Sequence, residues 1–303
     1  MTGDAKRDVG ASVRARLLAR SRAERTAFQL LLTRYALERL LYRLSRSPHR
    51  DRFILKGAML FATWVNAPFR PTRDLDLLGQ GEHSPEAVEE AFRSIFAQPV
   101  DDDGVAFDLV AMTASPIREE ADYGGIRLRT FATIAGARIP IQIDIGFGDA
   151  VIPGPVEIDY PPLLDGPAPR LLAYPVTSVV AEKFEALVVL GIANSRLKDF
   201  YDLWLIARTF EFDRASLREA VHRTFARRKT KLPTERPTGL SDAYAATWRQ
   251  QWQAFLGRER MAAAPIDLAI VISDLARFLL PLTEPTERDA RWSPDDGWKP
   301  TQD

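Results

Sequence analysis

The sequence predicts an α+β fold in which helices flank a mixed β-sheet, with a helical arm before the sheet and a helical lobe after it. Three observations predict this fold. A stretch without Gly or Pro from 12 to 47 has helical spacing, strand-like alternation fills the middle of the first half, and helical patterns dominate beyond residue 175. At 303 residues with 46% hydrophobic side chains, the chain can bury a sizeable core.

The N-terminal segment predicts a basic helical arm. Apolar residues recur at near-helical spacing from Leu17 to Leu44, with arginines between them. Residues 1–52 hold thirteen Lys and Arg against five Asp and Glu, although the formal net charge of the whole chain is zero. This arm and a second basic stretch over 218–236 could hold a nucleic-acid backbone, or they could be ordinary solvated helix faces.

Alternating patterns after the arm predict the sheet. The expected strands lie near 52–56, 73–78, 105–112, 126–134 and 138–147. A two-strand hairpin is expected across 135–137, and a helix over 85–97 should pack on the sheet. Residues 148–175 are rich in Pro and Gly, and we expect an irregular connection there.

Helical patterns predict the C-terminal lobe. Pro175 and Thr177 mark the start of its first helix and Gly191 its end, and a second helix follows Asn194. Further helices are expected at about 213–228, 241–256 and 264–281. The polar tail contains Trp292 and Trp298, which indicate that it docks on the protein.

Composition excludes several classes of site. The chain has no cysteine, which rules out a disulfide-linked partner, a thiolate zinc site and a cysteine nucleophile. The three histidines, His49, His83 and His222, are scattered and predict no metal cluster. No apolar run approaches the roughly 18 residues of a membrane span, and no signal peptide is recognisable. We therefore expect a cytoplasmic protein without a membrane partner.

Paired carboxylates are the strongest chemical signal. Asp74 and Asp76 alternate with leucines on one predicted strand, so they project from the same face roughly 6 to 7 Å apart. Asp144 lies on the strand 139–146 and faces away from its isoleucines, unless it only lines a solvated sheet face. Three carboxylates on adjacent strands are typical of a two-cation phosphoryl-transfer site, with Mg²⁺ as the metal.

A glycine turn precedes these carboxylates. The run Leu55-Lys56-Gly57-Ala58 predicts a turn that leads into a helix. Its backbone N–H groups and the positive helix end would bind phosphate. Lys56, Gly57 and Ala58 are therefore candidate nucleotide-binding residues.

Two charged motifs follow in the lobe. Lys183 lies in the middle of a helix and could reach a triphosphate if it faces a cleft. On the next helix, Lys198 and Asp202 are i,i+4 neighbours and Asp199 and Asp202 are i,i+3 neighbours. An ordinary helix salt bridge is the alternative interpretation.

Taken together, the motifs resemble the DNA polymerase β-type nucleotidyltransferases and, more narrowly, the AbiEii/AbiGii (MenT-like) toxin family. The narrower resemblance rests on five segments: 32–44, 53–58, 72–77, 181–186 and 196–203. Ala58 departs from the broad superfamily, which often has Ser or Gly there. A hydroxyl contact to phosphate is therefore missing, and backbone N–H groups would have to suffice.

The patterns along the chain give a domain plan, and the resemblance implies a set of site residues. The plan is an arm (1–50), a nucleotidyltransferase core (51–172), a helical lobe completing the nucleotide pocket (173–283) and a tail (284–303). Asp74, Asp76 and Asp144 would bind two Mg²⁺ ions. The counterparts of four lobe residues line the nucleotide pocket: Lys183, Lys198, Asp199 and Asp202. Of these, Lys183, Asp199 and Asp202 are expected to be catalytic.

The resemblance also implies a function. The protein would be a bacterial toxin of a toxin–antitoxin or phage-defence pair. It would transfer nucleotides from a nucleoside triphosphate to RNA, such as the tRNA 3′ end, release pyrophosphate and block translation. A separately encoded antitoxin of the AbiEi type would oppose it.

Three alternatives stay open. A small-molecule nucleotidyltransferase of the antibiotic-modifying kind would not need the basic arm. An enzyme that transfers AMP to protein hydroxyl groups would label protein instead of RNA. A catalytically silent interaction module would tolerate the loss of Asp74 and Asp76.

Overall fold

The computed structural model describes residues 8–64, 72–117, 124–259, 261, 263–285 and 289–301. The chain forms two compact units. The first comprises Met1–Gly148 and Val156–Ala173, and the second comprises Asp149–Pro155 and Tyr174–Asp303. The polypeptide therefore passes between the units three times. The four-part domain plan expected from the sequence stays a prediction.

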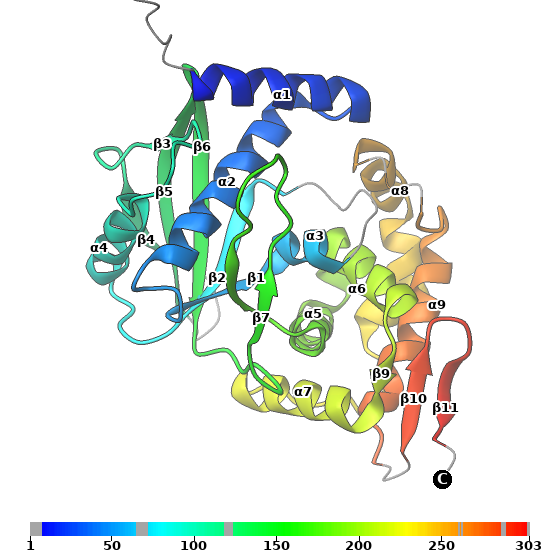
Figure 1. Ribbon diagram of the computed structural model, residues 1–303. Coiled ribbons are helices and arrows are strands. Elements are labelled where there is room, and N and C mark those ends of the chain that lie inside the picture. The colour runs from blue at the N-terminus through cyan, green and yellow to red at the C-terminus, as the bar shows by residue number, and fades with distance from the viewer. Residues whose placement is uncertain are drawn as a thin grey trace, which may run out of the picture. The chain divides into compact units, whose positions relative to one another are not determined.

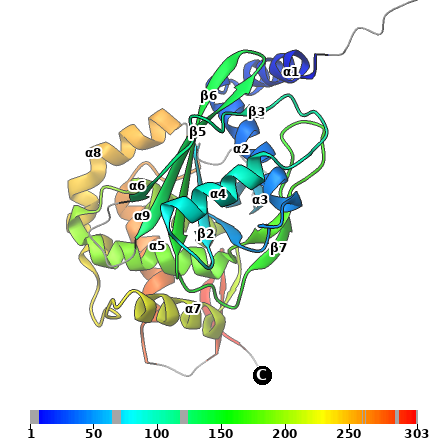
Figure 2. The same cartoon turned by 90° about the vertical axis from the view of Figure 1, so that its left-hand side faces the viewer.

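A mixed β-sheet is the centre of the first unit (Figures 1 and 2). Its strands are β1 (Phe53–Lys56), β2 (Asp74–Gly79), β3 (Ala106–Phe107), β4 (Thr113–Ile117), β5 (Gly125–Ile134), β6 (Ala137–Phe147), β7 (Val156–Asp159) and β8 (Arg170–Ala173). Within the described residues this is an eight-stranded sheet of order β3-β5-β6-β2-β1-β8-β7, with β4 beside β5. The β2–β6 and β1–β8 pairs are parallel and the others are antiparallel. The predicted α+β class is confirmed.

Most expected strands are found close to their expected bounds, and β5 and β6 form the expected hairpin. The strand expected over 105–112 is wrong in extent, because only Ala106–Phe107 is extended. The side chain of Asp108 accepts hydrogen bonds from the N–H groups of Val110 and Ala111. Such a turn ends the strand, and the chain returns as β4.

The expected irregular connection over 148–175 is also partly wrong, because it contains β7 and β8. These strands pair with each other, and β8 extends the sheet beside β1. The prolines lie between and around the two strands, whose own residues include neither Pro nor Gly. Leu171 and Ala173 are completely buried, so the short strand β8 contributes to the core.

Helices pack on the sheet of the first unit. They are α1 (Val9–Glu24), α2 (Phe28–Arg46), α3 (Phe61–Trp64) and α4 (Pro85–Phe96). Helix α2 packs on β6 and β8, and α4 packs on β4 and β5. The segment expected to be helical up to about residue 50 contains two helices, α1 and α2. The chain breaks at Arg25, whose left-handed φ of 52° turns the backbone so that the N–H of Thr26 donates to the carbonyl of Ser21.

The second unit is mainly helical. Its helices are α5 (Val176–Leu190), α6 (Leu197–Thr209), α7 (Arg214–Arg227), α8 (Asp242–Glu259) and α9 (Leu268–Leu279). Helix α5 packs on α6 and α7, and α9 packs on α6 and α8. Among the described residues, no helix combines the length and the apolar character needed to cross a membrane.

The tail docks on the second unit, as its tryptophans predicted. Strands β10 (Ala290–Ser293) and β11 (Gly297–Pro300) form a hairpin, and β10 also pairs with β9 (Phe212–Asp213). The indole of Trp292 donates a 2.8 Å hydrogen bond to the carbonyl of Ala207. Trp298 donates a 2.9 Å bond to Phe278. Residues 286–288, 302 and 303 lie outside the described part of the chain.

The first turn of α5 is held by the segment 149–155. The helix begins where Pro175 and Thr177 predicted, with Pro175 as the N-cap residue and no side-chain cap bond. The Thr177 hydroxyl instead donates to the carbonyl of Ile152 at 2.6 Å. The Ser178 hydroxyl oxygen accepts from the N–H of Ile152 at 2.9 Å. The helix ends at Gly191, as predicted.

Candidate active site

Three carboxylates gather on one face of the sheet in the first unit. On β2, Asp74 and Asp76 are partly exposed, whereas Leu75 and Leu77 are completely buried. The parallel register of β2 and β6 pairs Asp76 with Asp144. Register partners on neighbouring strands project to the same face, so the three carboxylates share this face. The alternation predicted from the sequence is therefore confirmed for all three.

Two bases extend the same row of register partners. Lys56 on β1 pairs with Asp76, and Arg127 on β5 pairs with Asp144. Across β5, β6, β2 and β1 the row therefore reads Arg127, Asp144, Asp76 and Lys56. We call these four residues the charged row. Two acids lie between two bases, which limits the repulsion between the neighbouring carboxylates.

Arg127 holds the Asp144 carboxylate with two hydrogen bonds. Its Nε donates to Oδ1 at 2.7 Å and its Nη2 donates to Oδ2 at 2.6 Å. These bonds, together with the charges of Asp144, Asp74 and Asp76, raise the pKa of the Arg127 guanidinium above its usual value despite its partial burial. A paired guanidinium and carboxylate of this geometry is among the stronger polar contacts in proteins.

Arg127 was missed by the sequence analysis, although a signal for it exists. The hairpin between β5 and β6 turns at Ala135 and Gly136, so Ile134 pairs with Ala137. Counting residue pairs back from this turn places Arg127 opposite Asp144 without further information.

Gly57 lies directly against the Asp76 carboxylate. Its φ of +73° is in the left-handed region that favours glycine, and a Cβ at this position would lie 2.0 Å from Asp76 Oδ2. The predicted turn is therefore confirmed. It leads into the 3₁₀ helix η1 (Gly57–Leu60) and then α3, and residues 65–71 lie outside the described part of the chain. Lys56 is partly exposed and Ala58 is buried.

The donor chemistry of this face fits a hard divalent cation. Carboxylate oxygens are the protein ligands that Mg²⁺ prefers, and Asp74, Asp76 and Asp144 are all partly exposed. Among the described residues, however, no group of three His, Cys, Asp or Glu side chains is already arranged around a metal position. Both carboxylate oxygens of Asp144 are engaged with Arg127. Asp74, Asp76 and Asp144 are the residues that would hold such a cation.

A second cluster of charged residues lies within the second unit. Lys183 from α5 donates to Asp199 Oδ1 at 2.6 Å and lies 3.0 Å from Asp202 Oδ2. Both aspartates are only 1% exposed. Burial alone would raise the pKa of Asp199, but the charges of Lys183 and Arg196 outweigh it and hold the pKa below its usual value.

This cluster differs from the pairs expected on α6 alone. Lys198 was expected beside Asp202, but Lys183 from the neighbouring helix lies between Asp199 and Asp202. Lys198 is exposed. Arg196, which the sequence analysis did not select, lies 2.7 Å from the second oxygen of Asp199. The lysine thus joins α5 to α6, because two buried carboxylates need a nearby positive charge.

One arginine of the basic stretch 218–236 is held by carboxylates, whereas most of its other basic residues are exposed. Arg228 is an ion-pair partner of three carboxylates, at 3.1 Å from Asp149, 3.5 Å from Glu182 and 3.0 Å from Glu185. Arg223 lies 3.6 Å from Glu219. Arg228 therefore links α5, the end of α7 and the segment 149–155 instead of lying on a solvated helix face.

The arginines of α1 are different. Arg14, Arg16 and Arg22 are exposed on a helix whose first turn has no acidic residue. Arg16 pairs with Asp165, which is itself fully exposed. This helix keeps the basic surface that the sequence predicted for the N-terminal arm.

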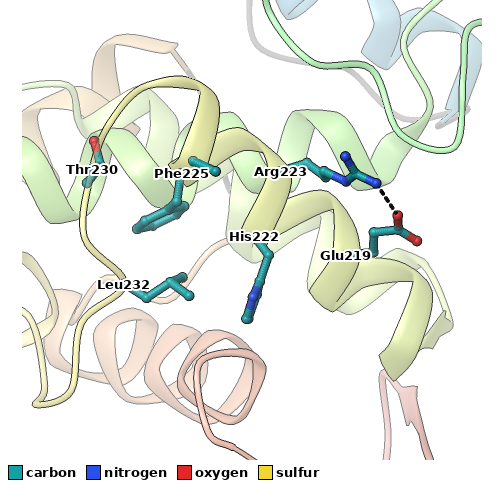
Figure 3. Close-up of a pocket in the computed structure, with 7 residues that line it drawn as sticks. Glu219, His222, Arg223, Phe225, Thr230 and Leu232 are labelled. Atoms are coloured by element: carbon teal, nitrogen blue, oxygen red, sulfur yellow. Dashed lines mark ion pairs between the residues drawn. The ribbon is translucent and has the colours of Figure 1, made fainter.

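A cavity of about 400 Å³ lies along α7 (Figure 3). The residues that line it include Glu219, His222, Arg223, Phe225, Thr230 and Leu232. Glu219 and Arg223 form an ion pair at one end of the cavity. The side chain of His222 extends from α7 in a different direction from these two side chains. None of the site residues predicted from the sequence lines this cavity, and it has a single carboxylate. Its chemistry does not match a two-cation site.

The comparison with protein families decides the identity of the chain. The model of the family described as the AbiEii toxin nucleotidyl transferases of type IV toxin–antitoxin systems matches residues 39–273. The chain belongs to this AbiEii family. The matched range contains every candidate site residue: Lys56, Gly57, Ala58, Asp74, Asp76, Asp144, Lys183, Lys198, Asp199 and Asp202.

Membership of the AbiEii family makes the protein a nucleotidyltransferase toxin. A family of type IV toxin–antitoxin systems also implies an antitoxin partner. The four charged-row residues and Gly57 all lie in the matched range, and so does the Lys183 cluster. The family assignment and the carboxylate face therefore concern the same part of the chain.

Two solved structures resemble this AbiEii protein in fold. A candidate nucleotidyltransferase from H. pylori has 11% sequence identity and a TM-score of 0.44, over 85% of this chain and 94% of that chain. JHP933 from Helicobacter pylori has 11% identity and a TM-score of 0.41, over 82% of this chain and 91% of that chain. No curated protein matches the sequence significantly.

Proposed function

We propose that this AbiEii-family protein transfers a nucleotide from a nucleoside triphosphate to an RNA, with the 3′ end of tRNA as the acceptor. Asp74, Asp76 and Asp144 would hold two Mg²⁺ ions. One observation carries the proposal: the three carboxylates share one sheet face in register, beside the Gly57 turn, in a chain of a nucleotidyltransferase family.

The transfer is a displacement at the α-phosphorus. The oxygen of the acceptor hydroxyl forms a bond to the α-phosphorus, and the bond from that phosphorus to the β-phosphate bridging oxygen breaks. Pyrophosphate leaves with the bonding electrons, and the hydroxyl proton passes to water. Bound divalent cations would neutralise the triphosphate and favour ionisation of the acceptor hydroxyl. The carboxylates supply positioning and electrostatic preorganisation, and no covalent enzyme intermediate is needed.

Other predicted residues receive supporting roles in this proposal. The turn Lys56-Gly57-Ala58 would bind phosphate through backbone N–H groups, since Ala58 has no hydroxyl. Lys183 and Lys198 are further candidate nucleotide-binding residues. Asp199 and Asp202 would act through Lys183, because both carboxylates contact its ammonium group.

The basic surface of α1 supports an RNA acceptor. Exposed arginines bind phosphate groups without reading sequence, which suits a large polyanion better than a small molecule. In this proposal the protein acts in the cytoplasm, blocks translation by modifying tRNA and is opposed by an antitoxin of the AbiEi type.

The proposal is tested by incubating the purified full-length protein with Mg²⁺, total RNA and each α-labelled nucleoside triphosphate in turn. The Asp74→Asn and Asp76→Asn variants should lose label transfer, since each lacks one charged metal ligand. Asp101→Asn is the matched control, because Asp101 is an exposed aspartate of the same unit outside the carboxylate face. Label in a tRNA-sized band with the wild type and Asp101→Asn alone would support the proposal.

Other outcomes favour the alternatives. Label in protein would indicate an AMP-transferring enzyme. Label in neither RNA nor protein, but in a small molecule of a cell extract, would indicate the antibiotic-modifying type. Equal transfer by the wild type and both aspartate variants would remove the carboxylate face from the reaction.

A further inference from the structure

The charged row has one member whose role the proposed function does not explain. Arg127 lies at the end of the row and donates two hydrogen bonds to Asp144, at 2.7 and 2.6 Å. Its guanidinium takes up both oxygens of a carboxylate that the proposed function assigns to a divalent cation. Two cations that need the same oxygens repel each other and compete for them.

We infer that Arg127 is a resident counter-ion that competes with a divalent cation for Asp144, so that Arg127 lowers the metal affinity of the carboxylate face. This inference rests on the proposed function, because it takes Asp74, Asp76 and Asp144 as the metal-binding residues.

Geometry supports an exchangeable contact. The side chain of Arg127 is 32% exposed and that of Asp144 is 21% exposed, so water and ions reach the pair. Because both side chains reach solvent, water can solvate the guanidinium and the carboxylate when the pair opens, which lowers the cost of exchanging Arg127 for a cation. A buried pair such as Lys183 with Asp199 lacks this freedom.

Charge gives the direction of the effect. Without Arg127, the three carboxylates would carry three negative charges on one face with Lys56 as the remaining base of the row. The guanidinium offsets one of these charges and is itself drawn by Asp74 and Asp76 as well as Asp144. Removing it should tighten the binding of a divalent cation, because the electrostatic attraction of the face increases.

The strand supplies a matched control. Arg129 lies two residues further along β5, so it projects to the same face of the sheet, and its register partner is the neutral Gln142. It is exposed, as Arg127 partly is. Loss of Arg129 removes the same charge from the same strand without touching Asp144.

The experiment measures Mn²⁺ binding to the full-length protein by electron paramagnetic resonance, without nucleotide. Arg127→Met should lower the dissociation constant for Mn²⁺ at least about tenfold, whereas Arg129→Met should change it by less than about threefold. With Asp144→Asn already present, Arg127→Met should have less than about a threefold effect, because the competition needs the carboxylate. Thermal unfolding without metal checks that each variant is folded. If Arg127→Met does not fold, Arg127→Gln takes its place in the measurement.

The inference is overturned by unchanged or weaker Mn²⁺ binding of the Arg127 variants, or by an equal effect of Arg129→Met. An Arg127 effect that persists without the Asp144 carboxylate also overturns it. Failure of the proposed function has a different signature. In that case Asp74→Asn and Asp76→Asn would bind Mn²⁺ as well as the wild type does. If these two variants lose Mn²⁺ binding but Arg127→Met binds Mn²⁺ with the wild-type affinity, the inference alone is overturned.

Discussion

The Asp76 carboxylate contacts Gly57 so closely that a Cβ on residue 57 would come within 2.0 Å of Asp76 Oδ2. One glycine thus sets both the path of the chain after β1 and the place of an acid on β2. Since Asp76 is also the register partner of Asp144, a shift of its side chain would disturb the whole carboxylate face.

We therefore predict that Gly57→Ala lowers the rate of nucleotide transfer at least about a hundredfold, since displacements of about 1 Å in a catalytic group have effects of this size. Gly136→Ala is the control. Gly136 has a similar φ of +76° but no atom within 4 Å of the added Cβ. Initial transfer rates and thermal unfolding of both variants separate the two effects, because backbone strain is common to both. Equal rate losses would show that Gly57 does not act through Asp76.

The Lys183 cluster should be essential for stability. Lys183→Met would leave two buried carboxylates without the ammonium group between them, and we expect a loss of about 3 kcal/mol in the free energy of unfolding. Lys198→Met, at an exposed position on α6, should change it by less than about 0.5 kcal/mol. Urea unfolding followed by tryptophan fluorescence reports on this unit, which holds five of the six tryptophans. Equal stability of the two variants would contradict the prediction.

The lowered pKa of Asp199 makes stability depend on pH in the acid range. A group whose pKa is lower in the folded state stabilises the protein above its unfolded pKa, and this contribution is lost as the pH falls through the folded pKa. The free energy of unfolding should therefore fall less steeply between about pH 5 and pH 3 in Asp199→Asn than in the wild type. Asp242→Asn removes a carboxylate that is 94% exposed and should keep the wild-type slope. Parallel slopes for all three proteins would exclude the predicted contribution of Asp199.

Arg228 should stabilise the second unit more than its basic neighbours do. It is the shared counter-ion of Asp149, Glu182 and Glu185, so Arg228→Met should cost about 3 kcal/mol. Arg223→Met removes only the exposed pair with Glu219 and should cost less than about 1 kcal/mol. Differential scanning calorimetry of the two variants measures the difference. A melting temperature of Arg228→Met equal to that of Arg223→Met would refute it.

The carboxylate face could be predicted because it depends on local alternation. Asp74 and Asp76 alternate with buried leucines, and Asp144 alternates with buried isoleucines, so each strand reveals its own polar face. The pairing of Asp76 with Asp144 depends on which strands become neighbours. Alternation within a strand does not reveal its neighbours, so the expectation that these two strands lie together rested on the family resemblance.

Other features were not predictable from local patterns. The break at Arg25 has no Gly or Pro to signal it, because a non-glycine residue adopts the left-handed conformation there. Strands β7 and β8 have four residues each, too few for a clear period. The contact of Lys183 with Asp199 forms between two helices, so spacing within either helix could not reveal it.

The hydrogen bonds between Ile152 and the first turn of α5 determine whether a gene fragment can encode the second unit by itself. Ile152 belongs to the short segment 149–155, which the chain contributes to the second unit before it returns to complete the sheet of the first. A gene fragment that began at residue 174 would encode α5 without the peptide that contacts Thr177 and Ser178, and without the Asp149 partner of Arg228. Neither unit is therefore a module that a single recombination event could exchange. The two are inherited as one interleaved whole.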